Sequence, residues 1–255
     1  MPERFSLHIL STPEQYNQFG VEMLIDLAQK AVADHGRFTI ALSGGGTPEG
    51  VYKLWGERPY RDQMPWQQTH LFWGDERLVP PDDPGSNYKQ IADLLLPHVP
   101  IPPENVHRAK GELASETAVA DYIHQLQPFA AANQPPVLDI ILLGMGSDGH
   151  TASLFPGSPV QQSAWVVGVT AEYDGRPAQR ITLTPTVINQ ARHIIFLVTG
   201  SNKAATLQNV LYGPHQPDQL PAQRIQPTHG TLTWLLDTAV AQNLINLTKQ
   251  DTDKH

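Results

Sequence analysis

Residues 138–157 of the chain are LDIILLGMGSDGHTASLFPG, and this stretch decides the fold class. Its apolar run at 140–143 is too short for a helix of its own and has the length of a strand buried on both faces. The glycines that follow allow tight turns, and the chain breaks at Pro156. In open α/β sheets, ligands bind outside the carboxyl ends of such strands. We therefore expect a buried strand that ends at a ligand site.

Asp148 and His150 lie inside that glycine turn. A carboxylate two residues from an imidazole can orient the ring or fix its tautomer, and histidine is well matched to proton transfer near neutral pH. The plainer interpretation is a loop histidine bonded to backbone next to a turn-forming aspartate. Thr151 and Ser153, which follow, are expected to cap or start a helix.

Composition excludes several classes of protein. The chain has 255 residues and a formal net charge of −8, which argues against a general binder of nucleic acid or of membrane surfaces. It has no cysteine, so disulfides, cysteine nucleophiles and thiolate metal sites are excluded, and a reducing cytoplasm is the expected location. No apolar run approaches the ~20 residues of a membrane span, and the N-terminus lacks a signal-peptide pattern.

Predicted strands and helices alternate along the chain. The predicted strands are 5–10, 37–42, 69–73, 140–143, 165–170, 180–183 and 193–198. The predicted helices are 15–34, 49–55, 88–96, 115–127, 184–191, one that begins near Ser201, and 231–247. This alternation predicts one α/β domain over residues 1–255, with a mostly parallel sheet flanked by helices.

A glycine loop follows the strand at 37–42. It consists of Ser43, Gly44, Gly45, Gly46, Thr47 and Pro48, and a predicted helix comes next. Glycines let backbone amides converge on phosphate oxygens, and a helix N-terminus adds favourable charge. The spacing matches neither the P-loop nor the dinucleotide fingerprint. A phosphate site is the favoured interpretation, and a simple tight turn is the alternative.

Charged residues follow two further strands. Asp75, Glu76 and Arg77 come after the strand at 69–73, and Lys203 comes after the strand at 193–198. An arginine can hold a phosphate or carboxylate as a planar fork, while the two carboxylates could position it or act on substrate. A lysine in the first turn of a helix opposes the helix dipole, so it could meet an anionic substrate. Solvated surface charges remain the alternative in both cases.

These features add up to one site. In a parallel sheet the carboxyl ends of the strands lie at one edge, so the glycine loop, Arg77, His150 and Lys203 should come together there. They supply amides, two cations and an imidazole without a cluster of metal ligands. Such a set suits acid–base or hydrolytic chemistry on a small phosphorylated molecule.

Four segments carry a family resemblance. They are SGGGTP at 43–48, WGDERLVP at 73–80 followed by Ser86 and Asn87, GMGSDGHTASLFPG at 144–157, and TGSNKA at 199–204. PAQRI at 221–225 and GTLTWLLD at 230–237, near the C-terminus, are similar to the same family. In this order the chain resembles the 6-phosphogluconolactonases. The third segment is the most specific and the glycine loop the least.

Glucosamine-6-phosphate deaminases share the superfamily, the glycine loop and the DGH turn. They have an acidic residue in an FNEPG-like stretch after DGH, and Asp-Glu-Tyr where this chain has Asp75-Glu76-Arg77. Here no carboxylate lies between Thr151 and Ser158, and Arg77 replaces the tyrosine. Both differences favour the lactonase; a deaminase or isomerase, or a non-catalytic sugar-phosphate sensor, are the alternatives. The chain has no GxSxG elbow for a serine hydrolase.

The resemblance implies a modified Rossmann-like domain that hydrolyses 6-phospho-D-glucono-1,5-lactone to 6-phosphogluconate, with no cofactor and no metal. It implies His150 as general base with Asp148 to orient it. Gly44, Gly45, Gly46, Thr47, Arg77 and Lys203 are the expected phosphate ligands, and Asp75 and Glu76 are expected to position substrate. We expect a cytoplasmic monomer whose partner is this small molecule, with no nucleic acid and no membrane.

Overall fold

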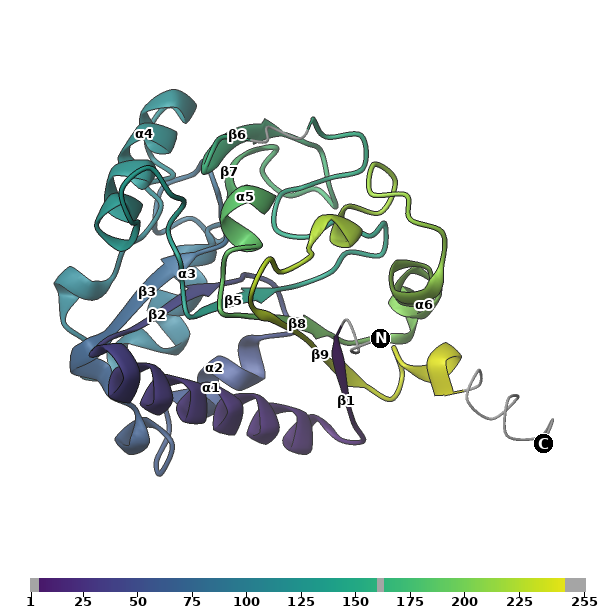
Figure 1. Ribbon diagram of the computed structural model, residues 1–255, viewed down its shortest axis with the longest axis horizontal. Coiled ribbons are helices and arrows are strands. Elements are labelled where there is room, and N and C mark those ends of the chain that lie inside the picture. Colours follow the sequence, from purple (N-terminus) through teal and green to yellow (C-terminus); the bar gives the residue numbers. More distant parts are fainter. Residues whose placement is uncertain (1–4, 160–162, 246–255) are drawn as a thin grey trace.

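A six-stranded parallel sheet forms the centre of the computed structural model, which describes residues 5–159 and 163–245. The strand order is β1-β9-β8-β5-β2-β3, and every neighbouring pair is parallel. Helices cover both faces (Figure 1). The strands of this sheet are β1 Ser6–Leu10, β2 Phe38–Leu42, β3 Thr69–Trp73, β5 Ile140–Leu143, β8 His193–Val198 and β9 Thr231–Asp237. This confirms the predicted α/β class and its mostly parallel sheet.

Short and long helices connect these strands. The α-helices are α1 Pro13–His35, α2 Glu49–Trp55, α3 Asn87–Leu94, α4 Ser115–Leu126, α5 Pro185–Ile188 and α6 Ala204–Tyr212. The 3-10 turns are η1 Arg61–Gln63, η2 Trp66–Gln68, η3 Leu96–His98, η4 Pro103–Asn105, η5 Gln127–Phe129, η6 Ser201–Lys203 and η7 Pro221–Arg224. No helix of the described residues is both long and apolar enough to cross a membrane.

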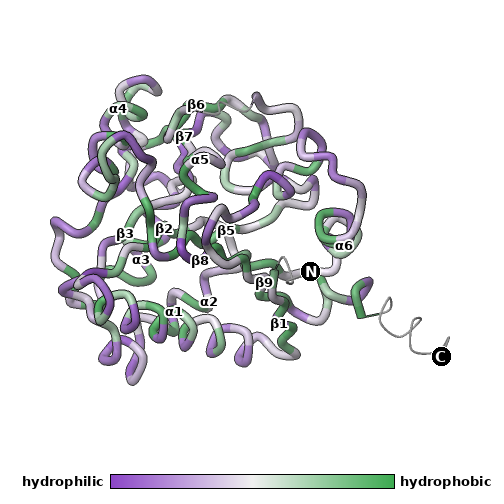
Figure 2. Tube along the Cα trace, viewed as in Figure 1, coloured by the Kyte–Doolittle hydropathy of each residue, from purple (hydrophilic) through white to green (hydrophobic). Residues whose placement is uncertain are grey.

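The central strands are buried on both faces, as their unbroken apolar sequences require. Side chains alternate along a strand, so Ile140 and Leu142 pack with α1, α2 and α3, while Ile141 and Leu143 pack with α4, α5 and α6. Hydrophobic residues accordingly run along the central strands, whereas α1 alternates between hydrophobic and hydrophilic (Figure 2). The helix α1 starts at a cap in which Thr12 accepts from the Gln15 amide, and it ends at Gly36 with φ 80°.

A second, antiparallel sheet lies beyond the carboxyl edge. Its order is β4-β7-β6, with β4 Asp75–Arg77, β6 Val166–Thr170 and β7 Gln179–Leu183. Gly74 joins the two sheets, because its amide donates to the Leu42 carbonyl while its own carbonyl accepts from the Leu183 amide. The segment 75–77, expected to be a loop, is therefore a strand, and nothing in the residue pattern predicted that 180–183 would pair with it.

The predicted helix at 231–247 is wrong. Residues 231–237 form β9, which lies between β1 and β8, and only 242–245 of the later described residues are helical. Trp234, Leu235 and Leu236 are fully buried and face both layers of the core. An apolar run buried on both sides satisfies a helical spacing as readily as a strand, so periodicity alone could not separate the two.

Candidate active site

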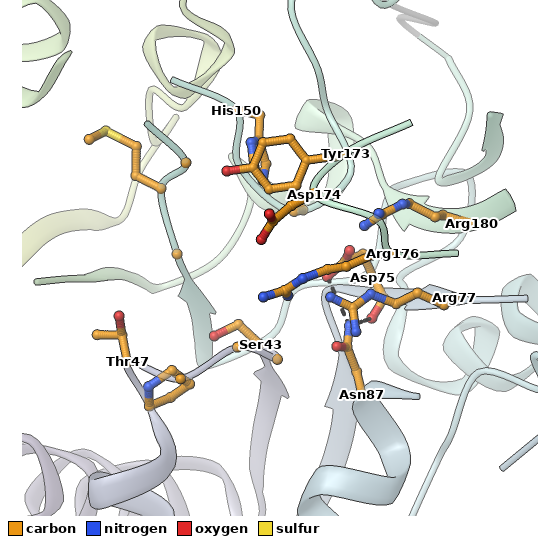
Figure 3. A pocket seen from close by; sticks show the side chains of 18 of the residues that line it. Ser43, Thr47, Asp75, Arg77, Asn87, His150, Tyr173, Asp174, Arg176 and Arg180 are labelled. Carbon is orange, nitrogen blue, oxygen red and sulfur yellow. Dashed lines mark hydrogen bonds between the residues drawn. The ribbon is translucent and has the colours of Figure 1, made fainter. Parts of the chain in front are cut away.

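Loops from four parallel strands and one hairpin meet at the carboxyl edge around a pocket of about 290 Å³ (Figure 3). The predicted site residues that line it are Gly44, Gly45, Gly46, Thr47, Asp75, Arg77, His150 and Lys203. Asp148 is hydrogen-bonded to His150 but does not itself line the pocket, and neither does Glu76. The lining residues that the sequence interpretation missed include Tyr173, Asp174, Arg176 and Arg180.

Hydrogen bonds from α3 fix the conformation of the glycine loop. The Gln90 side chain accepts from the Gly45 amide at 3.0 Å and donates to the Gly45 carbonyl at 2.8 Å. Gly45 has φ 98°, which favours glycine, and a β-carbon on Gly44 would collide with Asn87 Oδ1. The amides of Gly44, Gly46 and Thr47 have no protein acceptor among the described residues. Three amides of the loop are therefore available to an anion, while the Gly45 amide already donates to Gln90.

The end of β8 completes this side of the pocket. Thr47 Oγ1 and Thr199 Oγ1 lie 3.1 Å apart, which ties the glycine loop to the segment before Lys203. Lys203 ends the turn η6 and immediately precedes α6, one position before the first helical turn in which the sequence placed it. Burial lowers the pKa of the Lys203 ammonium, and the Asp237 carboxylate opposes that shift. A partly buried cation beside available amides suits a phosphate.

His150 and Asp148 form a hydrogen-bonded pair after β5. Asp148 Oδ1 lies 2.6 Å from His150 Nδ1 and also accepts from the His150 amide at 3.1 Å. Burial alone would raise the pKa of Asp148, but the hydrogen bonds and charge of His150 outweigh it and lower that pKa. An ionised carboxylate only accepts, so Nδ1 carries the proton and Nε2 is left as the acceptor atom.

The turn leaves no room for a larger residue at Gly146. A β-carbon there would lie 2.1 Å from His150 Nδ1, and Gly149 has φ 82°. Glycine at these two positions therefore lets the chain fold back so that His150 reaches Asp148. The expected helix after His150 does not form; Thr151 and Leu154 instead close a short bridge by mutual backbone hydrogen bonds.

Two aromatic rings hold the imidazole. The Phe155 ring stacks on His150 at 4.6 Å between centroids, and the Tyr173 ring meets it edge to face at 4.5 Å. Tyr173 lies at the tip of the β6–β7 hairpin, where Asp174 and Gly175 have φ of 51° and 64°. An Asp-Gly pair between two predicted strands is a strong signal for such a tight turn, and it could have located this tip.

Asp75, Glu76 and Arg77 divide between two faces, because alternate residues of a strand point in opposite directions. Asp75 and Arg77 line the pocket, and Asp75 Oδ2 accepts from Ser153 Oγ at 2.6 Å. Glu76 points away from it.

Glu76 instead caps α3. Its carboxylate accepts from the amides of Arg77, Asn87 and Tyr88, each at 2.7 Å, and from Ser86 Oγ at 3.0 Å. Burial raises the pKa of Glu76, and these four donors act in the opposite direction. The geometry therefore gives Glu76 a structural task, the positioning of β4 against α3, rather than the substrate contact that the sequence suggested.

Four cations and two carboxylates line the pocket. They are Arg77, Arg176, Arg180 and Lys203 on one hand, and Asp75 and Asp174 on the other. Within residues 5–159 and 163–245, no group of three or more histidines, aspartates and glutamates is placed to hold a metal ion. The site thus combines an oriented imidazole with an excess of positive charge, which suits proton transfer on an anionic substrate.

The family model for glucosamine-6-phosphate isomerases/6-phosphogluconolactonase matches residues 11–234. The chain belongs to this family. Two similar members of the glucosamine-6-phosphate isomerase/6-phosphogluconolactonase family are 6-phosphogluconolactonases from cyanobacteria. The Synechocystis protein is 41% identical over 84% of this chain and 88% of its own length, and the Nostoc protein is 42% identical over 88% and 92%.

Solved structures of the family share the fold. The 6-phosphogluconolactonase of Trypanosoma brucei superposes with a TM-score of 0.84 at 28% identity, over 94% of this chain and 98% of that one. A monomeric glucosamine-6-phosphate deaminase superposes with a TM-score of 0.80 at 22% identity, over 93% and 99%. The architecture is therefore common to both branches of the family, and the side chains must separate them.

Proposed function

We propose that this protein hydrolyses 6-phospho-D-glucono-1,5-lactone to 6-phosphogluconate, a step of the oxidative pentose phosphate pathway. The observation that carries the proposal is the His150–Asp148 pair, whose imidazole opens onto a pocket lined by four cations. The two cyanobacterial relatives bear the name of this activity at 41% and 42% identity. Arg77 and the lack of a carboxylate between Thr151 and Ser158 separate the chain from the deaminase pattern.

In the proposed mechanism, His150 Nε2 accepts a proton from a water molecule whose oxygen bonds to the lactone carbonyl carbon. The carbonyl oxygen becomes an oxyanion in the tetrahedral intermediate. The bond from this carbon to the ring oxygen then breaks, and the ring oxygen takes the proton back from His150. Asp148 keeps Nδ1 protonated and stabilises the imidazolium while it exists.

The amides of the glycine loop and the ammonium of Lys203 hold the 6-phosphate in this proposal. Thr47 and Lys203 both line the pocket, and the Thr47–Thr199 contact joins their two loops. A held phosphate positions the carbonyl at His150, so loss of these contacts should lower kcat as well as raise KM. Arg77, also predicted as a phosphate ligand, lies across the pocket from Thr47 (Figure 3).

The reaction should need no metal, because the imidazole itself activates the water. Activity is therefore expected to survive dialysis against a chelator. We further propose that the chain works as a single-domain cytoplasmic monomer. One hydrophobic cluster joins strands of both sheets, which supports a single domain. A charged sugar phosphate does not cross membranes freely, which supports a cytoplasmic location.

The deciding experiment is lactone opening. The lactone is generated in place from glucose 6-phosphate by a dehydrogenase, and the spontaneous rate is subtracted. Wild type should accelerate ring opening, and His150→Gln should lose roughly 10³-fold or more of kcat/KM, because proton transfer and its electrostatic support disappear together. His124→Gln, on the exposed surface of α4, is the matched control and should retain full activity.

Three outcomes would contradict the proposal. A folded His150→Gln protein with full activity would move the base elsewhere, with Asp75 next in line. A folded wild type that does not accelerate ring opening would point to the other branch of the family, for which release of ammonia from glucosamine 6-phosphate is the direct assay. Binding of phosphosugar without turnover of either compound would indicate a sensor.

A further inference from the structure

Arg77 and Arg180 form an unusual pair between the two strands of the small sheet. In the antiparallel register of β4 and β7 they lie directly opposite each other. Like charges at such positions destabilise a sheet. Both are buried, with 9% and 2% of their surfaces exposed, so water does little to screen the repulsion. The fold therefore holds two guanidinium groups together at a cost.

Several donors of this pair lack acceptors. Arg77 Nε and Arg180 Nε and Nη2 are buried without a hydrogen-bond partner in the described part of the chain, although Arg77 Nη1 donates to the Gly85 carbonyl at 2.7 Å. Burial lowers the pKa of Arg180, the charge of Arg77 lowers it further, and Asp75 opposes both. Paired, unsatisfied guanidiniums have the chemistry of an anion site, because a carboxylate fits their planar forks.

This pair lies at the reacting end of the pocket. The Arg180 guanidinium carbon is 5.3 Å from the centroid of the Phe155 ring, and that ring stacks on His150. Arg77 and Arg180 approach from one side of the pocket, whereas Thr47 lies on the other (Figure 3). The glycine loop and Lys203 already supply a phosphate site on the Thr47 side.

We propose that Arg77 and Arg180 form a second anion subsite, which binds the oxygen atoms on the carbonyl carbon of the lactone. This inference rests on the proposed function and replaces the assignment of Arg77 to the phosphate. When water bonds to the carbonyl carbon, the π electrons move to the carbonyl oxygen, which accepts from the guanidiniums. After the ring bond breaks, the same pair holds the carboxylate of the product. Arg180 thereby becomes a catalytic residue.

Product binding separates the two subsites. 6-Phosphogluconate carries a phosphate and a carboxylate, glucitol 6-phosphate carries a hydroxymethyl group instead of the carboxylate, and inorganic phosphate lacks both the sugar chain and the carboxylate. Affinities of all three are measured by calorimetry for wild type, Arg180→Met and Arg180→Lys. Arg58→Met is the matched control, because the Arg58 side chain is 74% exposed and belongs to neither subsite.

Wild type should bind 6-phosphogluconate more tightly than glucitol 6-phosphate. Arg180→Met should weaken 6-phosphogluconate by roughly ten- to a hundredfold while the other two affinities change by less than about threefold. It should lower kcat for lactone opening by roughly 10²- to 10³-fold, the usual loss for one oxyanion donor. Arg180→Lys keeps the charge without the fork and should fall between wild type and Arg180→Met.

The Tm of the ligand-free protein distinguishes an anion-binding arginine from a merely structural one. Removal of one of two like charges should leave the Tm of the ligand-free protein unchanged or raise it. A sharp fall in Tm together with an equal loss of affinity for all three ligands would overturn the inference and show that Arg180 is structural. Equal losses of affinity for phosphate and for 6-phosphogluconate at unchanged Tm would overturn the inference as well, because they would show that the arginine pair binds the phosphate group.

Failure of the proposed function would look different. Wild type would then leave the lactone at its spontaneous rate and still prefer 6-phosphogluconate over glucitol 6-phosphate through Arg180. That result would keep the carboxylate subsite and remove the reaction.

Discussion

Strand β5 has a histidine–aspartate pair at each of its ends, and the two pairs differ in what they leave available. At the carboxyl end, Asp148 and His150 are joined at 2.6 Å; at the amino end, Asp139 and His35 are joined at 2.9 Å. Both aspartates approach a histidine nitrogen with one oxygen. Only the first pair opens onto the pocket.

At the amino end, the Asp139 carboxylate already has four hydrogen-bond and ion-pair partners. Asp139 accepts from the amide and the hydroxyl of Thr39, from His35, and from Arg192 at 3.2 Å. It joins β2, β5 and the end of α1, and its own side chain is 5% exposed. Both oxygens of the Asp139 carboxylate are therefore engaged in contacts that hold the fold together.

The pair at the carboxyl end leaves one atom for chemistry. Because only one residue separates Asp148 from His150, the carboxylate reaches the near nitrogen Nδ1, and the outer nitrogen Nε2 stays available. The His35 pair uses Nε2 instead, since its carboxylate comes from a distant segment. A histidine–aspartate contact is therefore not a catalytic signature by itself. What decides is which ring nitrogen the carboxylate leaves unbonded and whether that nitrogen can reach the pocket.

Exchange of the two carboxylates for amides should split activity from stability. Asp148→Asn should lower kcat by roughly 10²-fold, because the amide no longer enforces the tautomer or stabilises the imidazolium. Asp139→Asn should leave kcat near the wild-type value, because the whole length of β5 separates it from the pocket. It should reduce the free energy of unfolding by about 1–3 kcal/mol, since an amide cannot accept from all four donors.

Lactone opening and denaturant unfolding, measured on both variants, test the split. The comparison fails if Asp139→Asn loses as much activity as Asp148→Asn at equal folded fraction. It also fails if Asp148→Asn proves the more destabilised of the two proteins.

The sequence predicted much of this site because its main features are local. Strand, glycine turn and Asp148–His150 lie within one short segment, so the order of residue types already implies the geometry. The same holds for the glycine loop after β2. Parallel strands then place these loops at one edge without any knowledge of the strand order.

The rest of the site depends on contacts between distant segments. Arg180 lies inside a predicted strand, and only its register opposite Arg77 brings it to the pocket. Glu76 looked like a site residue because Asp75 and Arg77 flank it, yet strand alternation turns it toward α3. The sequence also could not place β9 in the sheet, because a strand buried on both faces has no periodicity of its own.

A third paired histidine, His107, extends the comparison to pH. His107 Nε2 lies 3.1 Å from His70 Nδ1, and its ring stacks on Phe72. Burial, helped by the charge of His70, lowers the pKa of His107 to about 4. The folded state thus keeps this ring neutral where the unfolded chain already binds a proton.

His107 should therefore make stability fall with acidity. Its contribution is fully present above the unfolded pKa of about 6.5 and is lost as the pH falls toward 4, by about 1–2 kcal/mol once its partial exposure is allowed for. Urea unfolding of wild type and His107→Phe across this range measures it. The variant should lose less stability than wild type between pH 6.5 and 4, and parallel curves would contradict the assignment.

The smallest expected effect belongs to Tyr173, which distinguishes the His150 pair from the other two through its edge-to-face contact at 4.5 Å. Such a contact is worth about 0.5–1.5 kcal/mol, so Tyr173→Leu should lower kcat by roughly two- to tenfold. KM and Tm should hardly change, because the ring orients the imidazole from a surface hairpin. Tyr173→Phe keeps the ring and should match wild type; a loss equal to that of Tyr173→Leu would show that the hydroxyl group, not the ring, is what His150 needs.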